Sequence, residues 1–217
     1  MRMIMRLPRL VEVFMVALLC VAGGARAADI EEAVALVATP RLAGSAFERT
    51  VVLTAALPSG VHVGFIVNFP TDLKLATLFP EQPATAGVAS PVYIGGPVQP
   101  QALFAVARTP PTDKENQNLF QLMPGLVVAI EAGAVDHIIE TSPNDARYFL
   151  GLLVWRPGEL EEEVSDGVWE VRPADVDMVF SASPRNLWKS LYRGTGVVGI
   201  WARADAPARA RLVVASE

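Results

Sequence analysis

Residues 147–155 read Arg-Tyr-Phe-Leu-Gly-Leu-Leu-Val-Trp, and residues 156–163 continue as Arg-Pro-Gly-Glu-Leu-Glu-Glu-Glu. The first of these segments is almost continuously apolar, which predicts a long strand that is covered on both faces. The Pro-Gly pair predicts a turn. The glutamate-rich residues 159–164 then predict a short helix that ends at Gly167, since glycine commonly follows the last residue of a helix.

Strands and short helices are expected along the rest of the chain. Residues 47–68 predict a β-hairpin, because two segments rich in β-branched residues flank the turn at Pro58-Ser59-Gly60. Further strands are expected at 92–94, 102–107, 126–129 and 169–172, and helices at 71–79, 134–140 and 184–193. Residues 109–118 hold no apolar residue outside their prolines and predict an exposed, mobile loop. This mixture, without regular βαβ alternation, indicates an α+β fold in a single domain.

Residues 1–27 have the features of a secretory signal peptide. Three arginines within residues 1–9 form a basic head, an apolar core follows at 13–22, and Ala25-Arg26-Ala27 offers a small-x-small cleavage site. The core is about ten residues long, short of the ~20 that a membrane-spanning helix needs. We expect cleavage after Ala27, a periplasmic or secreted mature protein, and no stable transmembrane segment after cleavage. An uncleaved anchor is the alternative.

Composition limits the classes of partner. The predicted leader carries four arginines and one glutamate, a net +3, so its removal changes the formal charge of the chain from −5 to −8. Cys20, the only cysteine, leaves with it, so a core of adequate size must hold the mature protein together without disulfides. A negative chain without a cluster of Lys and Arg argues against a nucleic acid partner.

Four blocks of sequence, in order and at sensible spacing, resemble the AlgH/YqgE family of bacterial proteins. They are residues 38–42 with 47–53, residues 64–70, residues 95–98, and residues 149–163 followed by Trp169. With this resemblance we assign a domain to residues 28–200 and a C-terminal tail to residues 201–217. The resemblance implies a bent, mixed β-sheet that closes into a pseudo-barrel with short flanking helices, and it implies no established reaction.

The chain departs from the family pattern in several places. Val61 and His62 stand where relatives usually have Gly-Ala, Phe69 stands where they have arginine, and Glu159 where they have glutamine. Typical members also lack an export signal. We therefore interpret the chain as an exported, diverged branch, in which a cytoplasmic role such as the transcriptional regulation assigned to some relatives is in doubt.

Seven positions are candidates for a ligand site or for the family signature. They are Arg41, Arg49, Asn68, Gly95, Gly96, Trp155 and Glu159. The two arginines are suited to a small anionic ligand, although Arg49 pairing with an acid on the surface is an equally simple account. Glycines at strand ends usually provide a positive φ or allow two backbones to approach closely.

The glutamates of residues 159–163 allow two interpretations. At 100° per residue, Glu159, Glu162 and Glu163 share one face of the predicted helix and Glu161 points elsewhere. Such carboxylates suit acid/base chemistry or a hard cation. Acidic side chains in a first helical turn also interact favourably with the positive end of the helix, and this structural account is the simpler one.

No catalytic group, cofactor site or metal site is predicted. Residues 194–199 match G-x-G-x-x-G, but a helix precedes them where a dinucleotide site needs a strand. His62 and His137 have no Ser, Cys or carboxylate partner at motif spacing. The leading hypothesis is a non-enzymatic binding or accessory protein of the cell envelope, whose partner is an envelope protein or a small anionic ligand. A transcriptional regulator and a carboxylate-dependent hydrolase are the alternatives.

Overall fold

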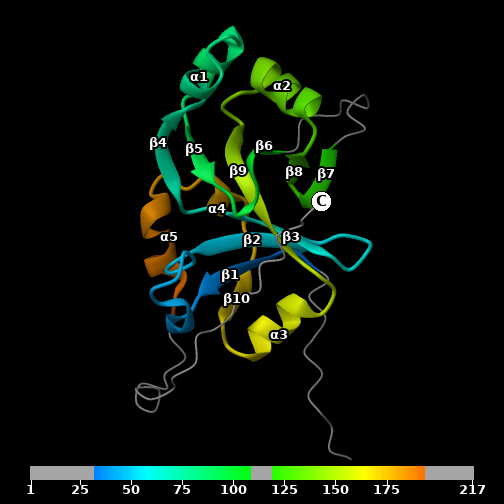
Figure 1. Ribbon diagram of the computed structural model, residues 1–217, viewed down its shortest axis with the longest axis vertical. Coiled ribbons are helices and arrows are strands. Elements are labelled where there is room, and N and C mark those ends of the chain that lie inside the picture. Colours follow the sequence, from blue (N-terminus) through cyan, green and yellow to red (C-terminus); the bar gives the residue numbers. More distant parts are fainter. Residues whose placement is uncertain (1–31, 109–118, 194–217) are drawn as a thin grey trace, which may run out of the picture.

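The computed structural model describes residues 32–108 and 119–193, and it shows a curled β-sheet with short helices around it (Figure 1). The predicted signal peptide, the loop at 109–118, the glycine pattern at 194–199 and the C-terminal tail lie outside the described residues. Ten strands form one sheet in the described chain, and its pairs are antiparallel except for one. The prediction of a single α+β domain with a bent, mixed sheet is confirmed.

The lower half of the sheet in Figure 1 consists of antiparallel strands in the order β10-β1-β2-β3. The strands are β1 (Val34–Ala38), β2 (Val51–Ala56), β3 (His62–Ile66) and β10 (Trp169–Pro173). The predicted hairpin is confirmed as β2 and β3, but β2 begins four residues later than expected. The chain first makes a 3-10 turn, η1 (Pro40–Leu42), and a series of turns that are closed by hydrogen bonds such as Thr50 N–H to the Phe47 carbonyl.

The upper half has the order β4-β5-β9-β6-β8-β7. Its strands are β4 (Pro70–Lys74), β5 (Pro91–Ile94), β6 (Val98–Arg108), β7 (Leu119–Met123) and β8 (Leu126–Ala129), together with β9 (Ala146–Trp155). β7, which the sequence analysis did not predict, closes a hairpin with β8 and also contacts β2. This contact brings the far edge of the curled sheet back toward the lower half, as expected for a pseudo-barrel.

β9 belongs to both halves. Its first part pairs with β5 and β6, and its last part, from Leu153 to Trp155, pairs with β3. Between the two parts lies Gly151 with φ +70°, a conformation that favours glycine. The segment after β5 crosses at this point, because a Cβ on Gly95 would lie 2.1 Å from the Gly151 carbonyl oxygen. The long central strand predicted from residues 147–155 is therefore confirmed, and it bends at its own glycine.

Five short helices cover the sheet in the described chain. They are α1 (Leu75–Leu78), α2 (Ala132–Thr141), α3 (Glu159–Ser165), α4 (Val176–Val179) and α5 (Pro184–Leu191), with a further 3-10 turn η2 (Pro83–Gly87). The helices predicted at 134–140, 159–164 and 184–193 are confirmed. None of these helices, within the part of the chain described, is long and apolar enough to cross a membrane.

The helix predicted for residues 71–79 is wrong in its first half. Residues 70–74 form β4, which pairs with β5, and only residues 75–78 are helical. Thr71, in the first half of this segment, donates its hydroxyl to the Val92 carbonyl oxygen at 2.7 Å. Tertiary pairing with a neighbouring strand has overridden the local apolar spacing.

Three apolar clusters form the core. The first joins aromatic side chains of β3, β6 and β9, including Phe65, Phe104 and Phe149, to α4 and α5. The second packs α2 against the opposite face of the upper sheet, around Tyr148. The third joins α3 to the lower sheet, around Trp155. Burial of each large apolar side chain contributes about 1.5–3 kcal/mol, and β9 supplies residues to all three clusters.

Candidate functional site

The glutamate-rich helix α3 is held to the sheet by a carboxylate between two tryptophans. Glu163 Oε2 accepts hydrogen bonds from Trp155 Nε1 at 3.0 Å and from Trp169 Nε1 at 2.7 Å. These indoles come from β9 and β10, on either side of α3 in the chain, and both are buried. The carboxylate satisfies two donors that would otherwise lie buried without a partner, so it joins the three elements.

Glu159 closes the turn at the start of α3. Its Oε2 accepts from the Arg156 backbone N–H at 2.9 Å, and the Arg156 Nε lies 3.7 Å from the same oxygen. Gly158 provides the left-handed residue before the helix, with φ +85°. The arrangement resembles a capping box, in which a side chain three residues into the turn satisfies an earlier backbone donor.

Glu161 and Glu162 do not lie as the helical spacing predicted, with Glu162 on the face shared with Glu159 and Glu163 and Glu161 pointing elsewhere. Glu162 is exposed, whereas Glu161 faces the sheet with its Oε1 3.9 Å from His62 Nε2. The buried Leu160 sets the inward face of the helix, and at 100° per residue Glu161 and Glu163 flank that face while Glu162 lies opposite. No group of three or more His, Cys, Asp or Glu residues is placed to hold a metal ion in the described ranges.

Asn68 and Arg49 lie together at the start of β2. Asn68 is buried, and its side chain accepts from Val51 N–H at 2.7 Å and donates to the Arg49 carbonyl oxygen at 2.9 Å. Arg49 has φ +59°, and its exposed guanidinium lies 3.6 Å from Glu48 and 5.8 Å from the centre of the Trp188 ring. These contacts shape the turn before β2 and pair Arg49 with a surface acid.

The other arginine and the glycine pair lie elsewhere. Arg41 is an exposed residue of η1, and its side chain approaches the turn between α3 and β10, since a Cβ on Gly167 would lie 3.8 Å from the Arg41 Nε. Gly95 and Gly96 pack against the backbone of β9, and a Cβ on Gly96 would lie 2.3 Å from the Leu152 carbonyl carbon. The structure thus uses these glycines for close backbone approach. None of the seven candidate residues lines the cavity described next.

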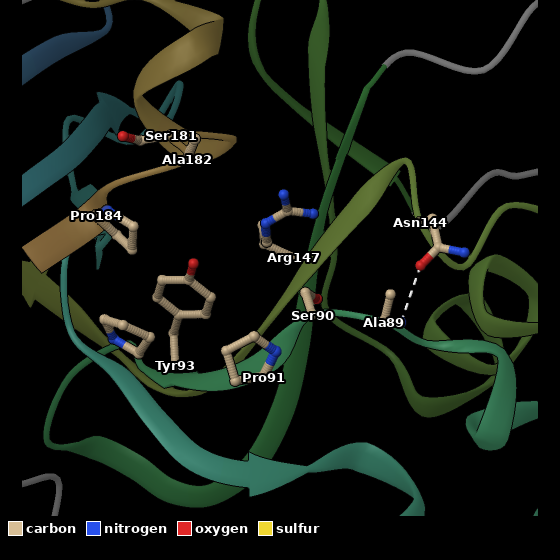
Figure 2. A pocket seen from close by; sticks show the side chains of 10 residues that line it. Ala89, Ser90, Pro91, Tyr93, Asn144, Arg147, Ser181, Ala182 and Pro184 are labelled. Carbon is tan, nitrogen blue, oxygen red and sulfur yellow. Dashed lines mark hydrogen bonds between the residues drawn. The ribbon is translucent and has the colours of Figure 1, made fainter.

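A cavity of about 510 Å³ opens where the start of β9 meets the segment between α4 and α5 (Figure 2). It lies on the face of the upper sheet that carries the first apolar cluster. Its walls are mostly apolar and small, and its polar side chains come from Arg147, Tyr93, Asn144 and two serines. The lining residues are Pro70, Ala89, Ser90, Pro91, Tyr93, Asn144, Arg147, Ser181, Ala182 and Pro184.

Arg147 is the charged residue of this cavity. Its guanidinium donates to the Ala146 carbonyl oxygen at 3.0 Å and lies 4.8 Å from the centre of the Phe180 ring. Within the described chain it makes no ion pair. Arg108, on the neighbouring strand, also lies over Phe180, at 4.2 Å, but Asp177 neutralises it at 3.3 Å. Of the two guanidiniums on this ring, only Arg147 therefore keeps its charge without an acidic partner.

Of the three hydroxyl groups in the lining, Ser181 already accepts from Ser183 N–H at 3.2 Å, and those of Tyr93 and Ser90 accompany Arg147. Tyr93 is only 3% exposed, its ring packs against Phe149, and its hydroxyl points into the cavity in Figure 2. The Ser90 hydroxyl is buried and makes no hydrogen bond to any described residue. Asn144 is different, because its amide is used to hold the cavity wall: it accepts from Ala89 N–H at 2.9 Å and donates to the Gly87 carbonyl oxygen at 3.1 Å.

Sequence reasoning missed this site. Arg147 was only the first residue of the predicted buried strand, and Tyr93 belonged to a short strand without any motif. One signal was present in the sequence, namely a lone arginine at the head of an otherwise apolar strand. A charge in that position requires either an acidic partner or a place open to solvent or ligand.

Comparison with known proteins agrees with the fold. The family model described as AlgH-like matches residues 35–198. A UPF0301 protein of Myxococcus xanthus is 32% identical over 168 residues, which cover 75% of this chain and 89% of the relative. A UPF0301 protein of Ruegeria pomeroyi is 31% identical over 176 residues, 79% of this chain and 95% of the relative.

Two solved structures are similar to this chain. A crystal structure of a Corynebacterium diphtheriae protein has a TM-score of 0.60 and 26% identity, and the match covers 74% of this chain and 84% of that one. The solution structure of the AlgH protein of Pseudomonas aeruginosa has a TM-score of 0.58 and 25% identity, and it covers 73% and 84%. These matches support the curled-sheet fold described above.

Proposed function

Since the chain belongs to the AlgH-like family, we propose that it is a non-enzymatic ligand-binding or accessory protein of the cell envelope. The proposal has two parts, a location and a mode of action. The location is supported by the sequence of residues 1–27. The mode of action is supported by the cavity beside Arg147, which combines apolar walls with a few converging polar groups. Such cavities are typical of small-molecule sites.

The cavity is the observation that carries the binding role. A guanidinium without an acidic partner and a buried hydroxyl without a hydrogen bond both have unused capacity to donate. Polar groups in such positions usually find a partner in protein, water or ligand. The α3 glutamates that prompted the hydrolase alternative contrast with these groups, because Glu159 and Glu163 are already hydrogen-bonded within the fold.

The location is tested with a reporter. Residues 1–40 are fused to alkaline phosphatase that lacks its own leader, and residues 28–40 fused in the same way are the control. We expect activity in cells only with the longer fusion, because the enzyme needs the oxidising periplasm. An inactive longer fusion that is present at normal amounts would refute the envelope location and would restore the cytoplasmic, regulatory alternative.

The binding role is tested on the natural material. The full-length gene is expressed, the exported protein is purified from the periplasmic fraction, and its mass is measured under native and denaturing conditions. We expect a native mass that exceeds the polypeptide mass by a reproducible amount, from a small molecule or a protein partner. Identical masses from repeated preparations, together with no co-purifying protein, would contradict the proposal.

A further inference from the structure

We propose that the cavity beside Arg147 binds a small organic monocarboxylate, with the carboxylate on the Arg147 guanidinium and an apolar body against the proline walls. The inference rests on the proposed binding function and deepens it by naming the class of ligand. Its basis is the charge, the geometry and the shape of the cavity, taken in turn below.

The charge of the cavity calls for one negative group. Of its ten lining residues, Arg147 alone is charged, and none is acidic. Two other arginines lie close by but do not line the cavity: Arg108 pairs with Asp177, and Arg185 donates to the Pro70 carbonyl oxygen at 2.9 Å. The one cation in the lining is balanced by a monoanion, whereas a phosphate dianion is usually held by several cationic or backbone donors.

The geometry presents the guanidinium ready for a carboxylate. A guanidinium has five N–H donors, and the described contacts of Arg147 use one of its terminal nitrogens, at the Ala146 carbonyl oxygen. The Phe180 ring lies against the group at 4.8 Å and restricts its rotation. An edge with two parallel donors remains for a bidentate carboxylate, and the entropy cost of fixing it has already been met in the folded protein.

The hydroxyl groups extend the same recognition. Tyr93, on β5, points its hydroxyl into the cavity in Figure 2, and Ser90 comes from the position just before β5. Each can donate one further hydrogen bond to a carboxylate oxygen without adding charge. A carboxylate has about four lone-pair sites, so it can accept from the guanidinium and from a hydroxyl at the same time.

The shape of the cavity sets the body of the ligand. Three prolines and two alanines form most of its remaining surface: Pro70, Pro91, Pro184, Ala89 and Ala182. These side chains lack hydrogen-bond donors and acceptors, so they favour a short aliphatic or flat ring over a polyhydroxylated body. The volume of about 510 Å³ lies within the range of small-molecule sites.

The first test needs no variant. Mature wild-type protein, residues 28–217, is titrated by calorimetry with hexanoate, with the neutral isostere hexanamide and with inorganic phosphate, at fixed ionic strength. We expect hexanoate to bind, and hexanamide to bind at least about 10-fold more weakly, because the neutral amide offers a single carbonyl acceptor and cannot form the charge-assisted, bidentate pair with a guanidinium. Equal affinity of acid and amide, or binding of phosphate alone, would overturn the proposal.

The second test places the ligand at Arg147. Arg147→Met keeps the apolar stem and removes the guanidinium, so hexanoate affinity should fall by about 10–100-fold. Tyr93→Phe should reduce it by about 3–10-fold. Arg156→Met is the matched control, because Arg156 is exposed near the far end of β9. This variant should bind hexanoate like wild type. Unchanged affinity in a folded Arg147→Met protein would also overturn the proposal, and circular dichroism verifies folding.

The outcomes separate the two proposals. If hexanoate, a benzoate probe and phosphate all fail to bind at millimolar concentration while the periplasmic protein retains another ligand or partner, the monocarboxylate inference is wrong and the binding function stands. If the acid binds but the reporter fusion is not exported, the inference stands and the envelope location is wrong. The inference is supported if wild-type protein prefers hexanoate to hexanamide and if Arg147→Met loses hexanoate binding.

Discussion

The polar side chains at the two ends of β9 differ in whether they have partners within the fold. At the C-terminal end, Trp155 donates to Glu163, which also accepts from Trp169, and Glu159 closes the following turn. At the N-terminal end, Arg147 faces a cavity without an acidic partner among the described residues. One strand thus carries a closed polar network at one end and an open polar site at the other.

The residues that identify the family are therefore different from the residues that we propose to bind a ligand. The Trp-Arg-Pro-Gly-Glu segment identifies the family because several backbone and side-chain requirements coincide there, and each of them fixes a residue type. Those same requirements mean that the carboxylates of Glu159 and Glu163 are already hydrogen-bonded within the fold. Among the described residues the Arg147 guanidinium has no acidic partner and the Tyr93 hydroxyl has no hydrogen bond, and this is what leaves both groups available to a ligand. The predictions that follow test whether the two ends differ as described.

The joint between the ends should be the most sensitive position. Gly151→Val places a Cβ 2.1 Å from the Gly96 carbonyl oxygen at a residue with φ +70°, so the backbones of both halves must move apart. We expect the free energy of unfolding to fall by about 4 kcal/mol or more, as for the severest single substitutions. Urea denaturation followed by near-ultraviolet circular dichroism measures it.

A matched glycine provides the control. Gly133 lies in α2, where an added Cβ would meet no atom within 4 Å. Gly133→Ala should leave stability unchanged or raise it by about 0.5–1 kcal/mol, because alanine is the better helix former. Similar losses in both variants would show that Gly151 is not a special crossing point and that β9 need not bend there.

The closed network should respond next most strongly. Glu163→Ala leaves two buried indole N–H groups without their acceptor, at about 1–3 kcal/mol for each unsatisfied donor, so we expect a loss of about 2–4 kcal/mol. Glu162→Ala, on the exposed face of the same helix, should stay within about 0.5 kcal/mol of wild type. Chemical denaturation monitored by tryptophan fluorescence distinguishes them, and equal effects would mean that the network is not closed.

Alkaline pH should weaken the upper half through Tyr148, the neighbour of Arg147 on the opposite face. Burial raises the pKa of Tyr148 well above its usual range, with Arg147 opposing part of the rise. Its folded pKa is raised, so its contribution to stability is complete below about pH 10, the unfolded value, and is lost as the pH rises beyond it. Tyr148→Phe should therefore lose less stability than wild type between pH 9 and 11, as measured by thermal melts at each pH.

The same variant has a smaller effect at neutral pH. The Tyr148 hydroxyl donates to the Pro143 carbonyl oxygen at 3.2 Å, so Tyr148→Phe should cost about 1 kcal/mol at pH 7. Tyr93→Phe should cost less than about 0.5 kcal/mol, because no described residue hydrogen-bonds to its hydroxyl. A larger loss in Tyr93→Phe would indicate that the open end of β9 is held together internally after all.

At Glu159, loss of the charge alone should have little effect on stability. Glu159→Gln keeps an oxygen that can accept from Arg156 N–H, so stability should change by less than about 0.5 kcal/mol, whereas Glu159→Ala should cost about 1 kcal/mol, as for a lost helix cap. Thermal melts at pH 7 are sufficient. If Gln were as damaging as Ala, the charge itself would matter at this position, and the closed end of β9 would have to be reconsidered as a chemical site.

The sequence predicted the strands well where local signals agreed with the fold. The central strand, the β2–β3 hairpin and three of the helices follow from apolar spacing and turn residues. The failures share a cause. β4 and β7 became strands because neighbouring strands pair with them, and no local pattern in residues 70–74 or 119–123 records those partners.

The candidate site was harder to predict, because it depends on segments far apart in the chain. Pro70, Ser90, Arg147 and Pro184 come from four separate segments of the chain, and only the folded sheet brings them together. The sequence did lead to the idea of an anionic ligand on arginine, but it placed the idea on Arg41 and Arg49. Whether an arginine has an acidic neighbour is a tertiary property, as the difference between Arg108 and Arg147 shows.

The pairing of the first described strand with the last has a consequence for synthesis. β1 lies between β2 and β10, with Val34 opposite Pro173. The ribosome makes β1 and β2 early, but one edge of the apolar β1 has no partner until the chain has grown by about 140 residues. An exposed strand edge invites wrong pairing, and contacts this distant in sequence slow folding. The domain therefore cannot close during most of its translation, and a chain that stops before Trp169 is expected to aggregate.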